Sequence, residues 1–372
     1  MIRLASTAEY AYGNTRLRAR KADLLGPAEY ESLLDRDLDG VLEFLAGTAY
    51  RPEIEDALVA AGGKRALQIA VGRHLARMLD ELRAFYEERS GELVGLLLSR
   101  FDLQNLLTLL RGQVRGQPPE QTLANIVPLG VLGGAAAQEI ARQQDVTQAV
   151  ARLVAWRLPD EAAARTLADG WPEYERTADL TSLEHVLTAH HARHLDESLR
   201  AAGTNAASLR ELIAREHDAV NVLVVLRLRF ALQLDELSDL PRPPATGRFL
   251  AGGSIPEAAL EAALRQPTRQ EAVARLVDAA RRDDWRAPLQ RIASGGDLPT
   301  LQRDLEVSRV RFAVGLFVKG DPLGFDVPIA FTVALENEVR NLRLVGEGAT
   351  GGLSPAVLRT QLIVPWGGRW DT

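Results

Sequence analysis

Cysteine is absent from the 372-residue chain, and aromatic residues make up only 5% of it. Without cysteine there is no disulfide framework and no thiolate metal site, which fits a reducing cytoplasm. The scarcity of aromatic residues argues against a β-sandwich or barrel, whose strands favour Val, Thr, Tyr and Phe. Leu, Ala, Arg and Glu dominate instead. They lose little rotamer freedom in helices, so the composition favours an all-α protein.

Two further absences limit the possible functions. The formal net charge is −6 and the pI is about 5.7, so there is no excess of basic residues and we expect no nucleic-acid partner. No run of 18 or more apolar residues is present, and Met1–Lys21 lacks the apolar core of a signal peptide. We therefore expect a protein with no direct membrane span.

Most of the chain has apolar residues at the three- and four-residue spacing of buried helices. Clear examples are Glu92–Gly112 and Ser208–Leu234. Two segments rich in Pro, Gly and polar residues, Arg111–Gln121 and Leu237–Gly247, are the best candidate boundaries between structural units. The stretch Ser308–Val333 is rich in Val and Phe, and local propensity allows a hairpin there. We predict two helices around a Gly-Asp-Pro turn, because the neighbouring units are helical.

Internal repeats are the main feature of the sequence. QAVARLV at Gln148–Val154 recurs as EAVARLV at Glu271–Val277, a shift of 123 residues (271 minus 148). The pair Gly133–Gly134 matches Gly252–Gly253, a shift of 119. Self-similarity at a fixed period indicates a repeat architecture.

A polar pattern inside apolar helices also recurs. An acidic residue is followed by Asn three residues later and, in two of three copies, by Arg nine residues later. In the third copy Glu347 takes the place of that Arg, and an Arg stands two residues after the Asn. The three sets are Asp102, Asn105 and Arg111; Asp218, Asn221 and Arg227; and Glu338, Asn341 and Arg343. We predict three helical units, residues 1–118, 119–242 and 243–372, each ending with this helix.

The physical role of the pattern follows from helix geometry. At 100° per residue, Asp102 and Asn105 lie on one side of the helix, whereas Arg111 lies on the opposite side from Asp102. The Asp and the Arg must therefore contact different neighbours. A buried Asn needs hydrogen-bond partners, most simply backbone groups at a helix end or turn. We interpret the set as a structural tether rather than a catalytic site, which would need several groups converging on a cleft.

Three motifs resemble ligand sites. Residues 35–46 open like a calcium loop but have Ala46 where a bidentate Glu belongs, so we expect a turn between helices, with Asp39 capping the second. Gly63-Lys64 lacks the other residues of a phosphate-binding loop. A histidine cluster could bind a metal, although a polar helix face is the simpler interpretation. Its members are His185, His190, His191 and His194.

Together these motifs resemble one known family. YAYGNTRLRARKADLL, FDLQNLLTLLR, REHDAVNVLVVLRLR, FLAGGSIP and ENEVRNLRLVGEG occur in order from Tyr10 to about Leu362. Each is weak alone, but their order and spacing are similar to those of the C-subunit family of V/A-type ATPases, whose vacuolar relative is the d subunit. The third unit departs from the pattern at Arg343 and Glu347, which puts its local arrangement in doubt.

The resemblance implies a funnel-shaped, all-helical protein with threefold pseudosymmetry. It further implies a rotor subunit without cofactor or catalytic site, present once per complex and peripheral on the cytoplasmic face of the membrane. The implied partners are the D and F subunits of the central shaft, which insert into the funnel, and the membrane proteolipid ring. Whether the pump moves protons or sodium, in which direction it runs and which residues contact the partners stay open.

Two other functions are compatible with parts of the sequence. A helical interaction scaffold unrelated to an ATPase is one, although known helical repeats are much shorter, at about 33 to 47 residues. An all-α metalloenzyme using His185, His190 and His194 is the other, and metal analysis of the purified protein discriminates it.

Overall fold

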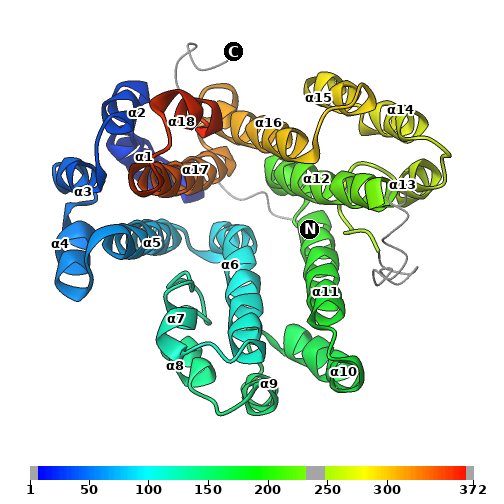
Figure 1. The fold of residues 1–372 in the computed structure, drawn as a ribbon, viewed down its shortest axis with the longest axis horizontal. Helices are drawn as coiled ribbons and strands as arrows, with labels where there is room; N and C mark the ends of the chain where they lie inside the picture. The colour runs from blue at the N-terminus through cyan, green and yellow to red at the C-terminus, as the bar shows by residue number, and fades with distance from the viewer. Residues whose placement is uncertain (1–6, 232–247, 366–372) are drawn as a thin grey trace. The chain divides into compact units, whose positions relative to one another are not determined.

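The computed structural model describes residues 7–231 and 248–365, with side chains from 10 to 228 and from 248 to 365. Within these ranges all regular secondary structure is helical, which confirms the all-α prediction (Figure 1). The predicted boundary segment Arg111–Gln121 contains the junction between two helices, since α6 ends at Val114 and α7 begins at Pro119. The boundary predicted at Leu237–Gly247 lies outside the described residues.

The chain divides into two compact units, with the divisions inside α9 and α16. The first consists of residues 1–153 and 313–372, and the second of residues 154–312. The helices are, in order, α1 (Thr7–Arg20), η1 (Lys21–Asp23), α2 (Pro27–Leu34), α3 (Leu38–Ala46), α4 (Arg51–Ala60), α5 (Gly63–Ala84), α6 (Glu88–Val114), α7 (Pro119–Leu123), α8 (Ala135–Ala141), α9 (Val146–Ala155), α10 (Glu161–Thr177), α11 (Leu180–Ala201), η2 (Gly203–Ala206), α12 (Ala207–Ala231), α13 (Glu257–Leu264), α14 (Arg269–Ala280), α15 (Asp283–Ala293), α16 (Leu298–Lys319), α17 (Asp326–Gly351) and α18 (Pro355–Gln361). The predicted division into three units remains a prediction.

Helix α17 is the central helix of the first unit. Every residue from Val327 to Leu335 is buried, and the helix packs against α1, α2, α3, α5 and α18. Figure 1 shows the N-terminal helices beside the C-terminal α17 and α18. The two ends of the chain therefore share one hydrophobic core.

The Val- and Phe-rich stretch is helical, as predicted. Helix α16 ends at Lys319 and α17 begins at Asp326, with Gly320, Asp321 and Pro322 in the turn between them. The Asp326 carboxylate accepts a hydrogen bond from the Asp321 amide at 2.7 Å. Burial against the surrounding helices outweighs the strand propensity of Val and Phe, which is a weak preference in itself.

The core of the second unit lies among α12, α13, α14, α15 and α16. Its largest fully buried side chain is Trp285 of α15, which is 1% exposed. Val222 and Leu226 of α12 and Leu276 of α14 belong to the same cluster. Helices α10 and α11 pack against each other as a hairpin in this unit.

Three helices of similar sequence begin with the same cap. A side-chain oxygen of the residue before the helix accepts from the amide three residues later, in α3 (Asp37 to Gly40, 2.9 Å), α9 (Asp145 to Gln148, 2.8 Å) and α14 (Thr268 to Glu271, 3.2 Å). The expectation that Asp39 caps α3 was wrong. That helix already begins at Leu38, so the N-cap is Asp37, which has the extended backbone of a residue just before a helix.

These caps give a first testable prediction. Replacing Asp37, Asp145 or Thr268 by Ala removes one acceptor from a helix start and is expected to cost about 1 kcal/mol of unfolding free energy in each case. Urea denaturation followed by circular dichroism measures the change. Arg275→Ala, at an exposed position inside α14, is the matched control and should leave the midpoint in place. A similar loss for Arg275→Ala and Thr268→Ala would show that the cap contributes nothing.

Within the described residues one helix, α6, is long and apolar enough to cross a membrane by length and composition alone. Half of its apolar window is buried inside the protein, and α6 packs against α7 and α8. A core helix of a soluble protein passes the same test, so this is weak support for a membrane span. The packing favours the core interpretation.

Candidate functional site

The three predicted Asn residues are buried and make the same pair of hydrogen bonds. In each case the side-chain amide donates to the carbonyl oxygen of one residue further along the chain, and the side-chain oxygen accepts from the amide of that same residue. The pairs, with the Nδ2-to-carbonyl and amide-to-Oδ1 distances, are Asn105 with Val127 (2.7 and 3.0 Å), Asn221 with Leu250 (3.0 and 2.8 Å) and Asn341 with Ile363 (2.8 and 3.1 Å).

This geometry uses an amide side chain as a substitute for a strand partner. Asn has a donor and an acceptor side by side, which match the N–H and C=O of one extended residue. Each of those backbone groups would cost free energy if buried without a partner. The Asn therefore fixes a non-helical segment against a core helix, here called the Asn tether.

The carboxylates of the first two sets hold the same segments. Asp102 accepts from the Leu132 amide at 3.0 Å. Asp218 accepts from the amides of Ser254 and Ile255, both at 3.0 Å, and from the Ser254 hydroxyl at 2.7 Å. In each of these two loops the Asn binds a residue at the start, and the Asp binds a residue at the end, just before α8 or α13.

A glycine lies against each of these two carboxylates. A Cβ added to Gly130 would collide with the Asp102 carboxylate, and one added to Gly253 would collide with that of Asp218, so a side chain at either site would displace the carboxylate. Gly130 is therefore the equivalent of Gly253, at a shift of 123 (253 minus 130). The sequence match of Gly133–Gly134 with Gly252–Gly253 has the wrong register, because loops of different length separate the Asn from the glycine.

The third carboxylate has different partners. Glu338 is 3% exposed, and it accepts from the Leu25 amide at 2.5 Å and from the Tyr50 hydroxyl at 2.8 Å. Leu25 precedes α2 as Ile255 precedes α13, so at Glu338 the N-terminal segment supplies the backbone amide. The Tyr50 ring is stacked on His74, with 3.8 Å between ring centroids.

The predicted Arg residues are exposed in all three sets. Arg227 is exposed and donates to the Gln302 side chain at 3.4 Å, and Arg111 is also exposed. Arg343 is exposed and makes no ion pair with a described residue. Glu347, in place of the third Arg, pairs with Lys64 at 2.5 Å. In an ideal helix the side chain nine residues later faces away from the acidic residue.

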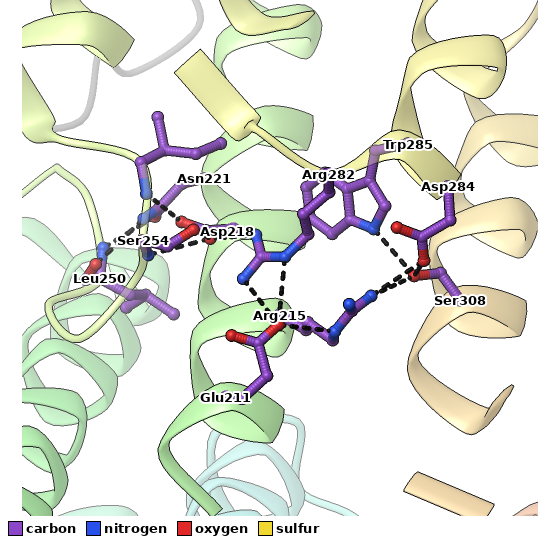
Figure 2. Close-up of polar contacts among 11 residues, drawn as sticks. Glu211, Arg215, Asp218, Asn221, Leu250, Ser254, Arg282, Asp284, Trp285 and Ser308 are labelled. Atoms are coloured by element: carbon purple, nitrogen blue, oxygen red, sulfur yellow. Dashed lines mark hydrogen bonds and ion pairs between the residues drawn. The ribbon is translucent and has the colours of Figure 1, made fainter. Parts of the chain in front are cut away.

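In the second unit the tether belongs to a larger polar network (Figure 2). Arg282 donates to Asp218 at 2.6 Å, and both side chains are withdrawn from solvent, at 6% and 0% exposure. The guanidinium also lies 5.0 Å from the ring centroid of Trp285 and 3.4 Å from Glu211. Arg215 pairs with Glu211 at 2.8 Å, so the two arginines share one carboxylate.

The network continues to α15 and α16. The Trp285 Nε1 donates to the Ser308 hydroxyl at 2.9 Å, and Arg215 donates to Asp284 at 2.9 Å. Ser308 in turn donates to Asp284 at 2.5 Å. Burial raises the pKa of Asp284, but the hydrogen bond from Ser308 and the charge of Arg215 outweigh it and leave the pKa below its ordinary value.

The histidine cluster lies on α11, in the second unit. His190 and His194 are i,i+4 neighbours, but no group of three or more His, Asp or Glu side chains in the described ranges is placed to hold a metal ion. Burial, followed by the neighbouring His217 and His194, lowers the pKa of His191 to about 4. His185 lines a pocket with Arg193, Phe249 and Glu257.

Sequence reasoning missed several residues that make these contacts. Arg282 and Ser308 lie 64 and 93 residues from the partners they contact on α12, and Leu25 lies 313 residues from Glu338. No local pattern marks them. The one available signal is the repeat itself. GVLEFLA at Gly40–Ala46 occupies the same position after its helix cap as QAVARLV and EAVARLV do after theirs.

What these groups do chemically is hold backbone. The carboxylates of Asp102, Asp218 and Glu338 accept from amides, hydroxyls or a guanidinium of the chain itself. The sequence matches the model of the ATP synthase (C/AC39) subunit family over residues 13–361.

The chain belongs to that family.

Relatives of the same kind match over nearly the whole chain. The C subunit of the V-type ATP synthase of Thermus thermophilus is 30% identical over 364 residues, which cover 96% of this chain and 99% of the relative. The C subunit of the A-type ATP synthase of Haloferax volcanii is 24% identical over 361 residues, covering 95% and 97%. That of Methanocaldococcus jannaschii is 22% identical over 362 residues, covering 96% and 86%. The chain is thus a homologue of the ATP synthase C subunit over its full fold.

Proposed function

We propose that this C-subunit homologue is the non-catalytic rotor socket of a V/A-type ATPase or ATP synthase. In this role it sits on the cytoplasmic side of the membrane proteolipid ring, receives the D and F subunits of the central shaft, and passes torque between them and the ring. The observation that carries the proposal is the match to the family along residues 13–361, together with relatives named as the C subunit of A-type and V-type ATP synthases.

The physical requirement of a socket is stiffness. A coupling piece that deforms under torque would store work instead of transmitting it. Well-packed helical cores have low compressibility, and hydrogen-bonded polar networks fix one arrangement of the backbone. The Asn tethers and the Asp218–Arg282 pair supply such fixation at the loops, which are otherwise the softest parts of a helical protein.

The proposal includes three pseudo-repeated units in a threefold, funnel-like arrangement. What supports it is the recurrence of one set of local structures: three Asn tethers, three N-capped helices with related sequences, and three carboxylates that hold the segment before α8, α13 or α2. In this scheme the third unit is completed by the N-terminal segment, and the boundaries near 118 and 242 fall after the first and second Asn helices.

Affinity purification tests the function directly. The tagged chain is expressed in its own cell in place of the native copy, and membranes are solubilised gently. We expect the shaft subunits, the small proteolipids and the ATPase head to co-purify, with one copy of this chain per complex. A tagged cytoplasmic protein of similar size and charge serves as the control. Recovery of the chain alone, without ATPase components, would contradict the proposal and favour an unrelated helical scaffold.

A further inference from the structure

The third carboxylate differs from its two equivalents in being a titratable group at a closure between the two ends of the chain. Glu338 lies on α17, and its two hydrogen-bond donors, Leu25 and Tyr50, are 313 and 288 residues away in sequence. Both donors are neutral. Asp218, the equivalent carboxylate in the second unit, is paired with the buried guanidinium of Arg282.

We propose that Glu338 makes this closure pH-sensitive: a protonated carboxyl holds the N-terminal segment on α17, and deprotonation loosens it. The proposal concerns the chain itself and does not depend on the proposed function. It rests first on geometry, namely a buried carboxyl that joins remote segments and has no cation among its contacts in the described residues.

The chemistry of the site suits a proton. A neutral carboxyl carries one O–H donor and keeps an acceptor, so it can accept from the Leu25 amide and donate to the Tyr50 oxygen. An ionised carboxylate only accepts, and its charge is then buried without a counter-ion, which is costly in a low-dielectric interior. Burial raises the pKa of Glu338 to about 7, although the two hydrogen bonds oppose the shift.

The described ionisable groups around Glu338 are neutral, paired with another residue or exposed. From α2, the buried Tyr30 stays neutral because burial and the nearby Glu338 raise its pKa well above the ordinary value. Behind Tyr50, Glu53 of α4 is neutralised by Arg77 of α5, and burial lowers the pKa of His74. Among the described charged side chains on the packed elements α1, α3 and α18, Arg16, Arg18, Asp39 and Glu43 are exposed, and Arg359 pairs with Glu31.

The sign of the effect follows from the two pKa values. In an opened segment Glu338 has the ordinary pKa of 4.5, whereas in the closed form its pKa is about 7. At a pH between these two pKa values, the closed form therefore keeps a proton that the open form releases. Closure is strongest below pH 4.5, weakens as the pH rises, and reaches its weakest level above pH 7. Acidification tightens the closure and alkalinisation loosens it.

Hydrogen exchange of the full chain measures the closure. Amides of residues 24–34 report opening of the segment held by Glu338, after correction for the intrinsic pH dependence of exchange. We expect the opening equilibrium to rise nearly tenfold per pH unit between about pH 5 and 6.5 and to level off above about pH 7.5. The segment before α13, held by the Asp218–Arg282 pair, should show no such rise.

Two variants isolate the carboxyl. Glu338→Gln keeps the shape, an acceptor and a donor, but cannot titrate, so the rise should disappear. His74 remains in that variant and acts in the opposite sense, since its protonation below its lowered pKa favours opening. Tyr50→Phe removes a donor to the ionised carboxylate, so it should raise the pKa of Glu338 and move the levelling to higher pH. A rise that persists in Glu338→Gln, or a wild-type chain without one, overturns the proposal.

Discussion

Replacing Asp218 with Asn is expected to cost about 3–5 kcal/mol of unfolding free energy, the typical result of leaving one member of a buried ion pair without its partner. The Arg282 guanidinium, 6% exposed, would lose its closest counter-ion. The new side-chain amide would also point at donors, because Ser254 and Ile255 both present N–H groups at this position. Urea denaturation at pH 7 gives the change as a shift of the midpoint.

Two comparisons decide whether the loss has this cause. The double variant Asp218→Asn with Arg282→Met removes both charges and is expected to recover part of the stability, since no buried charge is then left alone. Glu173→Gln, which breaks the exposed pair with Arg176, should leave the unfolding curve unchanged. A loss below about 1 kcal/mol for Asp218→Asn, or additivity in the double variant, would show that the pair does not stabilise the loop as described.

Each Asn tether is expected to contribute to stability. Replacement of Asn105, Asn221 or Asn341 by Leu keeps the side-chain volume but leaves the backbone N–H of the tethered residue without its acceptor. The Leu250 carbonyl also loses its donor, whereas the Val127 carbonyl keeps the Leu129 amide and the Ile363 carbonyl keeps the Asn337 side chain, both at 2.7 Å. At about 1–3 kcal/mol for each group left without a partner, the cost is about 1–3 kcal/mol for Asn105 and Asn341 and about 2–6 kcal/mol for Asn221. Unfolding midpoints of the three variants measure it.

The control for these substitutions is Asn125→Leu. That side chain is exposed and donates only to the Gln121 carbonyl one turn earlier, so its replacement should change stability little. The equivalence of the tethers is the sharper test. If any of the three Asn→Leu variants keeps the wild-type midpoint, the three tethers are not the same structural device, and the three-unit proposal loses its main support.

The fold class and the special status of three Asn residues could be predicted from the sequence, for physical reasons that act locally. Leu-rich helical spacing and the lack of aromatic residues favour helices wherever the chain is buried. A polar residue such as Asn105 in an apolar helix requires partners, so the pattern itself predicts a tether. Because each Asn bonds to a residue 22 or 29 positions later, its partner lies within one repeat length.

The remaining features depend on contacts that sequence spacing does not encode. The acidic residue of the third set meets Leu25 only because the N-terminal segment folds against the last core helix. Arg282 reaches Asp218 from a helix start whose place is set by tertiary packing. Arg343 carries the charge of the Arg in the other two sets and stands two residues after Asn341, but a residue two positions away on a helix faces another direction, and Arg343 lies exposed.

The most direct test of the central claim is a coupling measurement on the assembled machine. Membranes from cells lacking this chain are compared with membranes in which the wild-type chain has been restored, for ATP hydrolysis and for ion transport driven by ATP. As a rotor socket, the chain should be dispensable for hydrolysis by the head but required for transport, so restoration should return transport many-fold. Transport of equal size with and without the chain would contradict the account.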